Sequence, residues 1–189
     1  MKVKNIIKNT LLSINEPELY KTISVNIESS IPETEKSVLT TLINCINATN
    51  NLIASEYYYL KDSIKLNSNG KISFSNISNS VVINDILKVE KCGVAIPFKV
   101  LNNYIKTDCG EVEVFYSYLP TEVKSINETI TNYPIKINER IFSYGVISEY
   151  YYILGMYDDA SIWDLRFKNS LQNAIRPKHE IKIKQRLWL

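Results

Sequence analysis

Residues 138–171 read NERIFSYGVISEYYYILGMYDDASIWDLRFKNSL, and this stretch decides the fold. Within residues 141–153 the apolar positions recur at spacings of three and four, which predicts a helix. Asn138 is a suitable N-cap for that helix, and Gly155 is a natural stop at its end. Asp158-Asp159 then opens a second helix. Because the link between the two helices is very short, they must form an antiparallel hairpin.

The hairpin, with helices at about 138–155 and 158–175, carries a predicted packing face. Gly145 and Ser148 lie within one turn of each other and are small enough to let a partner helix approach closely. On the second helix, bulky residues repeat at helical spacing on one face. The predicted structural core of the hairpin consists of Gly145, Trp163, Phe167 and Leu171.

Two further helices are predicted before the hairpin. Apolar residues repeat at helical spacing over about 5–16, and Pro17 closes that helix. Residues 18–31 have no clear period and are predicted to be a loop. Pro32, followed by acidic residues, is a favourable opening for a helix at about 32–56. The apolar stripe of that helix is Val38, Leu39, Leu42, Ile43, Ile46, Leu52 and Ile53.

Residues 58–119 change to a period of two, which predicts an antiparallel sheet. Turn residues at 67–70, 91–93 and 108–110 divide the segment into strands, so we expect a meander. Pro97 argues for an edge position or a bulge, because proline cannot donate a ladder hydrogen bond. The last strand alternates most clearly, with Val112, Val114, Tyr116 and Tyr118 on one face.

The expected fold class is therefore α+β: four helices packed together, with the antiparallel sheet inserted between the two pairs. Residues 1–175 form one domain. Residues 121–136 are expected to be an irregular link between the sheet and the hairpin. Residues 176–189 are too short to have a core of their own and form an extended basic C-terminal arm.

The arm combines five cationic residues and one acid with a bulky Leu-Trp-Leu end. Three interpretations remain open. The arm could grip phosphates with Trp188 stacked on a base, it could add a strand to a neighbouring sheet, or it could be a disordered, solubilising end. The alternating pattern favours strand addition. The predicted partner-binding residues are Arg176, Lys178, Ile181, Lys182, Ile183, Lys184, Arg186, Leu187, Trp188 and Leu189.

Composition limits the classes of function. The net charge of +2 is too small to mark the whole chain as a nucleic-acid binder. The three cysteines are widely spaced and odd in number, which indicates free thiols in a reducing compartment. With His179 as the single histidine, no metal site is expected. The N-terminus lacks the pattern of a signal peptide, and no apolar run is long enough for a membrane span.

Little in the sequence indicates catalysis. His179 would have to act from the arm, and no glycine-rich phosphate loop is present. Glu56 and Glu149 each precede three tyrosines and could form a glycosidase-like acid pair. We favour the structural interpretation, in which Glu56 is a helix-end acid and Glu149 is partly buried and hydrogen-bonded within the bundle. Asp158-Asp159 is interpreted as an N-cap. No enzyme activity and no cofactor are expected.

The line from Arg140 to Phe167 resembles the C-terminal helical hairpin of the head-to-tail adaptor proteins of short-tailed bacteriophages, known as tail accessory factors or tail tubular protein A. The shared features are a tyrosine-rich helix, a glycine turn, an acidic start, and an aromatic and basic second helix followed by an arm. Residues 11–17, LLSINEP, resemble the start of the same family. The helix containing residues 43–47 and the sheet after it follow in the matching order.

This resemblance implies a virion protein made in the host bacterial cytoplasm and placed at the head-tail interface. It implies a ring homo-oligomer, a dodecamer, that docks under the portal protein, extends the channel for the genomic DNA and offers a platform to downstream tail proteins. Two alternatives stay open. The chain could be a nucleic-acid-binding regulator that uses its basic tail, or a cell-wall hydrolase that uses Glu56 or Glu149, since one family member is associated with peptidoglycan hydrolysis.

Overall fold

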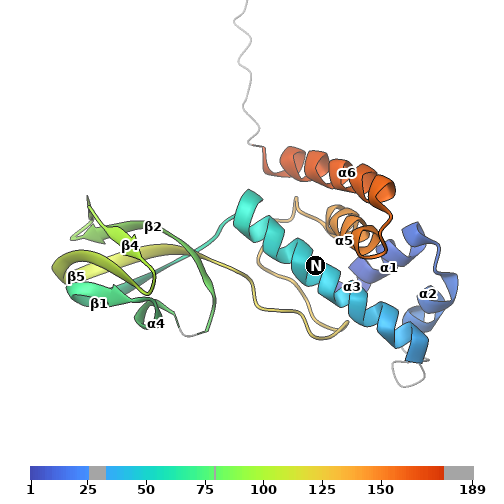
Figure 1. Cartoon of the computed structure of the whole chain (residues 1–189), viewed down its shortest axis with the longest axis horizontal. Helices are drawn as coiled ribbons and strands as arrows, with labels where there is room; N and C mark the ends of the chain where they lie inside the picture. The colour runs from blue at the N-terminus through green and yellow to red at the C-terminus, as the bar shows by residue number, and fades with distance from the viewer. Residues whose placement is uncertain (26–32, 79, 177–189) are drawn as a thin grey trace, which may run out of the picture.

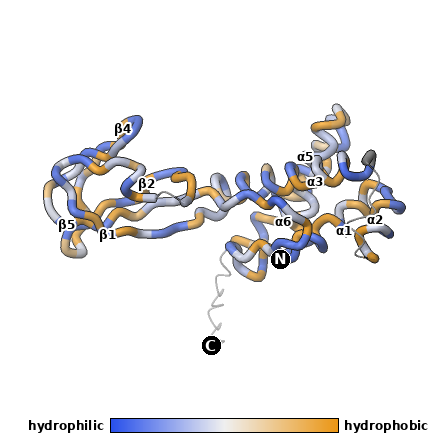
Figure 2. The backbone as a smooth tube through the Cα atoms, turned by 90° about the horizontal axis from the view of Figure 1, so that it is seen from below, coloured by the Kyte–Doolittle hydropathy of each residue, from blue (hydrophilic) through white to orange (hydrophobic). Residues whose placement is uncertain are grey.

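The computed structural model describes residues 1–25, 33–78 and 80–176. Helices gather at one end of the molecule and strands at the other, and two connecting segments join the ends (Figure 1). The view from below shows the same arrangement (Figure 2). The expected α+β class, with a sheet inserted into a mostly helical chain, is confirmed. The arm residues 177–189 lie outside the described residues.

The helical end is built around α5 (Glu139–Ile153), which contacts α1 (Val3–Ile14), α3 (Glu33–Leu52) and α6 (Tyr157–Ile175). The expected packing of four helices is therefore confirmed. Their apolar stripes share one core, because each helix places residues of spacing three and four toward the others. The largest fully buried side chains of this core are Ile6, Ile7, Leu11, Ile23, Leu42, Ile46, Ile53, Ile137, Phe142 and Phe167.

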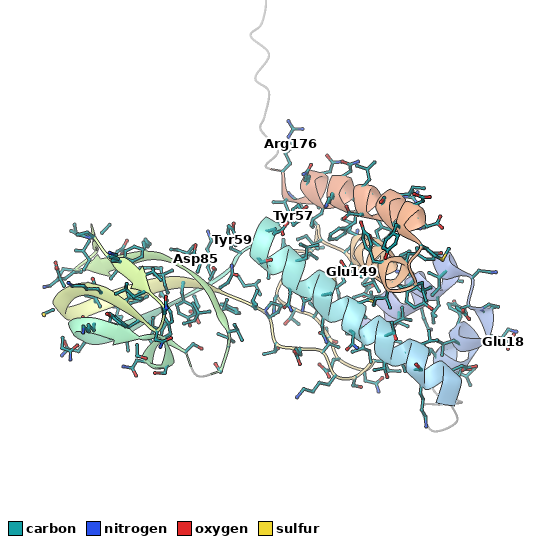
Figure 3. The ribbon with its side chains drawn as sticks, in the orientation of Figure 1. Glu18, Tyr57, Tyr59, Asp85, Glu149 and Arg176 are labelled. Atoms are coloured by element: carbon teal, nitrogen blue, oxygen red, sulfur yellow. The ribbon has the colours of Figure 1, made fainter. Side chains whose placement is uncertain are left out.

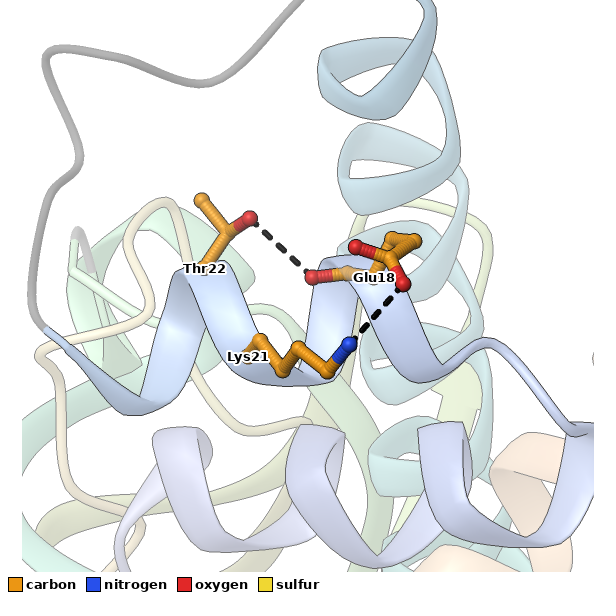
Figure 4. A network of polar contacts seen from close by, with 3 residues as sticks. All are labelled: Glu18, Lys21 and Thr22. Carbon is orange, nitrogen blue, oxygen red and sulfur yellow. Dashed lines mark hydrogen bonds and ion pairs between the residues drawn. The ribbon is translucent and has the colours of Figure 1, made fainter.

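One predicted loop is wrong, because a further helix, α2 (Pro17–Ser24), follows α1. Pro17 starts this helix at its first position, where a proline costs no hydrogen bond. On its surface Lys21 forms an ion pair with Glu18 at 3.0 Å, and the Thr22 hydroxyl donates to the Glu18 carbonyl at 3.1 Å (Figure 4). The helix was missed because eight residues are too few to show a period.

The sheet follows a five-residue π-helix (Ile53–Tyr57) that ends α3. Its strands are β1 (Leu60–Ser73), β2 (Ile83–Lys91), β3 (Val94–Ile96), β4 (Lys99–Leu101) and β5 (Tyr104–Tyr118), with a short helix α4 (Phe74–Ile77) after β1.

The pairing of the strands is antiparallel throughout, but the order differs from a meander. The strand β5 lies between β1 and β2, while β3 pairs with the other side of β2 and β4 pairs with β5. On β5, Val112, Val114 and Tyr116 are buried as the alternation predicts. The expected order was wrong because strand pairing depends on contacts between distant residues, which a period of two does not encode.

Two of the three predicted turns are wrong. Residues 67–69 pair with residues 109–111, so β1 and β5 run through both segments without reversing. The register shifts after Asn69, where Gly70 has a φ of 97°. Glycine in a strand marks a bulge as often as a turn, which explains the error. The third turn is confirmed, because Cys92 and Gly93 have positive φ and join β2 to β3 as a two-residue hairpin.

The link between the sheet and the hairpin is irregular, as expected, but it also closes the helical core. Val123 is buried, and its backbone N–H and carbonyl both bond the side chain of Asn47 on α3, at 2.8 and 3.0 Å. The N-terminal ammonium of Met1 donates to the carbonyl of Ile130 at 2.6 Å. The first helix and the link are thereby fixed to each other.

Candidate interaction surface on the helical hairpin

The hairpin begins and turns as the sequence predicts. The side chain of Asn138 caps α5 by accepting hydrogen bonds from the backbone N–H groups of Arg140 and Ile141, at 3.1 and 3.0 Å. Gly155 has a φ of 75°, a conformation that favours glycine, and it ends the turn after α5. The proposed cap at Asp158-Asp159 is wrong, since Met156 holds the N-cap position of α6 and both acids lie in its first turn.

Small residues bring three helices together on the inner side of the hairpin. A Cβ atom on Gly145 would lie 2.6 Å from Cγ2 of Thr49 on α3 and 3.1 Å from the ring of Phe167 on α6. The Ser148 hydroxyl donates to the carbonyl of Ala160 at 2.9 Å, inside the same contact. The predicted close approach at Gly145 and Ser148 is confirmed.

The core assignment is correct for Gly145, Phe167 and Leu171, which are buried, but wrong for Trp163, which is only half-buried. The ring of Trp163 lies at the edge of the hairpin, 5.6 Å from the ring of Tyr144 on α5. It was assigned to the core because it shares a helical period with Phe167. Trp163 and Phe167 are four positions apart, so their side chains point about 40° apart around the helix axis. This difference places Trp163 at the edge of the core.

Two arginines cover these aromatic rings. The guanidinium of Arg166 lies 5.1 Å from the ring centres of both Tyr144 and Trp163. Nε of Arg140 donates to the hydroxyl of Tyr144 at 2.6 Å. Neither arginine has an ion pair among the described residues. The rings therefore hold two exposed cations in place without neutralising them.

The outer side of the hairpin exposes large apolar side chains. At the turn between α5 and α6, Ile153 is 60% exposed, Leu154 53% and Tyr157 66%. On the outward face of α6, Ile162 and Leu165 are 65% and 62% exposed. We call the exposed apolar residues at the turn the hairpin tip. The hairpin tip consists of Tyr152, Ile153, Leu154, Met156 and Tyr157.

Exposed apolar residues scattered one by one are ordinary, but a contiguous group marks an interaction surface. Sequence reasoning missed the hairpin tip because it treated these residues as the end of a buried stripe. The available signal was the apolar run 150–157, which is longer than one buried face of a helix needs.

The structure does not bring the two candidate acids together. Glu149 lies on α5 beside Cys45 of α3, whose thiol it affects electrostatically, whereas Glu56 lies eleven residues further along, in the π-helix. Eleven helical residues span about 16 Å. Figure 3 shows Glu149 among the helices and Tyr57, the neighbour of Glu56, at the end nearest the sheet. Glu56 is an exposed helix-end acid, as predicted.

Glu149 differs from its predicted state in one respect. It is partly buried, but its carboxylate makes no hydrogen bond or ion pair within the described residues, so the expected bundle hydrogen bond is absent. Burial raises the pKa of this carboxyl, and the nearby carboxylate of Asp164 raises it further. Asp164 itself is paired with Lys168 at 2.8 Å.

The cysteines are free thiols. Burial, and next the charge of Glu149, raise the pKa of the Cys45 thiol from 9.0 to about 12, so this thiol stays protonated and unreactive. Cys92 and Cys109 are exposed on the sheet. Across residues 1–25, 33–78 and 80–176 no cluster of side chains could hold a metal ion, and no helix is long and apolar enough to cross a membrane.

The predicted arm begins at Arg176, which is exposed at the end of α6 (Figure 3). The other predicted partner-binding residues, and His179, lie outside the described residues.

A hollow of about 500 Å³ at the junction of helices and sheet is lined by Tyr57, Tyr58, Tyr59, Leu60, Lys61, Tyr118 and Asn132.

No protein-family model matches the chain, and no curated protein matches it.

Proposed function

We propose that this chain is a structural virion protein, a head-to-tail adaptor that forms a ring beneath the portal protein. In this role it extends the DNA channel and provides the attachment platform for downstream tail proteins. The single observation that carries the proposal is the hairpin tip, where large apolar side chains are exposed on a rigid helical support.

The tip has the composition of a protein-binding surface. Aromatic residues and methionine are enriched at interfaces, and the tip contains both. Full burial of a large apolar side chain contributes about 1.5–3 kcal/mol, so each half-exposed tip residue offers about 1 kcal/mol more on assembly. The close contact at Gly145 and the hydrogen bond from the Ser148 hydroxyl to the Ala160 carbonyl hold the two helices of the hairpin together.

The order of elements is a second support. Helices, then an inserted sheet, then a helical hairpin and finally a basic arm are the order that the resemblance to phage adaptors implies. The elongated shape, with helices at one end and the sheet at the other, would let one end serve ring contacts while the other reaches a second partner (Figure 1). No catalytic step is part of this proposal.

Co-sedimentation with portal particles tests the proposal. The purified chain is mixed with the portal protein encoded in the same genome, and bound chain is measured after centrifugation. A variant with Leu154→Glu and Tyr157→Glu should lose binding, because charges replace the apolar contacts of the tip. Val94→Glu is the matched control, since Val94 is 66% exposed on the sheet, as Tyr157 is on the hairpin.

Binding by the native chain and the control, together with loss of binding by the tip variant, is the expected result. If the native chain fails to bind portal particles, or if the tip variant binds as well as the native chain, the proposal is wrong. Clearing of peptidoglycan, or salt-dependent binding to DNA without portal binding, would favour the hydrolase or the regulator instead.

A further inference from the structure

The outward face of α6 carries a stripe of the kind that pairs helices. Its members are Asp158, Ile162, Leu165 and Asn169, at spacings of four, three and four residues. This heptad spacing places them in one row along the helix. The opposite face of α6 buries Phe167 and Leu171, so the row is fixed toward the outside. All four members of the row are exposed.

Two opposite charges flank this row on one side. Asp159 and Arg166 are both exposed, and neither has an ion pair within the described part of the chain. They are seven residues apart, which is about 10.5 Å along the helix, so they do not pair with each other. The rings of Tyr144 and Trp163 hold the guanidinium of Arg166 at this position.

We propose that α6 pairs with α6 of a second copy of the chain, with the two helices antiparallel. In that arrangement Ile162 of each copy meets Leu165 of the other, and the two apolar layers cover each other. At the same time Asp159 of each copy comes beside Arg166 of the other. One surface thus supplies two apolar layers and two ion pairs, because a two-fold axis repeats each contact.

Charge decides both the direction and the kind of partner. In a parallel pair the flank that carries Asp159 and Arg166 would face the opposite flank of the second copy, where Ser161 lies beside Arg166, so these two charges would not meet each other. A nucleic acid is disfavoured as the partner, because residues 139–176 carry five acids and four bases. A nucleic acid would also leave the apolar side chains of Ile162 and Leu165 uncovered. A second copy of the chain supplies opposite charges and also covers the apolar row.

This pairing does not depend on the adaptor function. A two-fold contact closes on itself, whereas ring contacts run head to tail, so the pair is a state of the chain outside a ring. The surface is small, and the pairing is therefore reversible and sensitive to concentration.

Sedimentation velocity of the full chain over a range of concentrations tests the pairing. The native chain should shift from monomer to dimer as its concentration rises. Leu165→Glu should abolish the dimer. Asp159→Arg and Arg166→Glu should each weaken it by about tenfold or more, because each creates like charges at two contacts. The double variant D159R/R166E should restore the dimer, since the charges are exchanged and still complementary.

The exchange experiment separates this proposal from a loss of folding. Residues 159 and 166 do not touch within one chain, so rescue by the double variant must come from contacts between copies. Lys99→Glu on the sheet is the matched control and should dimerise normally, and a melting curve for each variant checks that it is folded. A native chain that stays monomeric at all concentrations would overturn the proposal. So would a dimer that is unaffected by Leu165→Glu, or charge variants that weaken it without rescue in the double variant.

Discussion

Replacing Gly145 by alanine tests the packing on which the hairpin rests. The new Cβ would lie 2.6 Å from Cγ2 of Thr49 and 3.1 Å from the ring of Phe167, both in the buried core. Overpacking of this kind costs about 1–3 kcal/mol, and the upper half of that range applies because two helices would have to move. An alanine within a helix stabilises the fold by about 1 kcal/mol relative to a glycine. The net expectation is a loss of about 1–2 kcal/mol.

Urea unfolding, followed by circular dichroism, measures this loss. In a thermal melt the same change corresponds to a fall of roughly 2–8 °C in Tm. A second variant, Thr49→Ser, removes the methyl group that the new Cβ would meet. In the double variant the cost of Gly145→Ala should therefore become smaller, which a double-mutant cycle reveals as a coupling. A Gly145→Ala chain as stable as the native one, or more stable, would refute the close three-helix contact.

Three further predictions concern single side chains, and a fourth concerns the arm. Glu149→Gln should be more stable than the native chain at pH 7, because its carboxyl has a raised pKa in the fold; the native chain should gain stability as the pH falls toward 4.5, and the variant should lack that gain in melts at several pH values. Trp163→Ala should cost about 1–2 kcal/mol in urea melts, less than a fully buried tryptophan, and a loss above about 3 would contradict the half-buried position. Tyr133→Phe should cost about 1–2 kcal/mol, because the Tyr133 hydroxyl bonds oxygens of α3 at 2.7 and 2.9 Å; an unchanged melting curve would show that this bond contributes nothing. Deleting residues 177–189 should leave the melting curve unchanged but prevent co-sedimentation with portal particles. Full occupancy by the truncated chain would show that the arm is not needed for binding.

The helical half of the fold could be predicted because its signals are local. Asn138 and Gly155 bound α5 through their own backbone preferences, and Gly145 marks a close contact that only a small residue permits. The α2 helix could not be predicted in the same way, since its position depends on packing of Leu19 and Ile23 into a core made by distant segments.

The sheet was predicted in kind but not in order. Alternation along β5 identifies its buried face, but nothing in that pattern says that β1 and β2 are its two neighbours. Gly70 and Gly110 were interpreted as turns, although both lie within long paired strands. A positive φ is common to turns and bulges, so the glycine alone cannot distinguish them.

The candidate surface on the hairpin was not predicted. The sequence drew attention to the arm, while the hairpin tip and the outward row of α6 became visible only when burial was known. Ile162 and Leu165 look like core residues in a sequence because they are apolar within a helix. Which side of α6 is buried follows from Phe167 and Leu171, whose contacts lie on other helices.

Electron microscopy of portal particles incubated with the purified chain tests the adaptor proposal most directly. The expected result is a second ring, coaxial with the portal, that is built from copies of this chain and continues the portal channel. The hairpin tip should lie within the contacts of that ring. Portal particles that keep their original outline after incubation with an excess of folded chain would contradict the proposal.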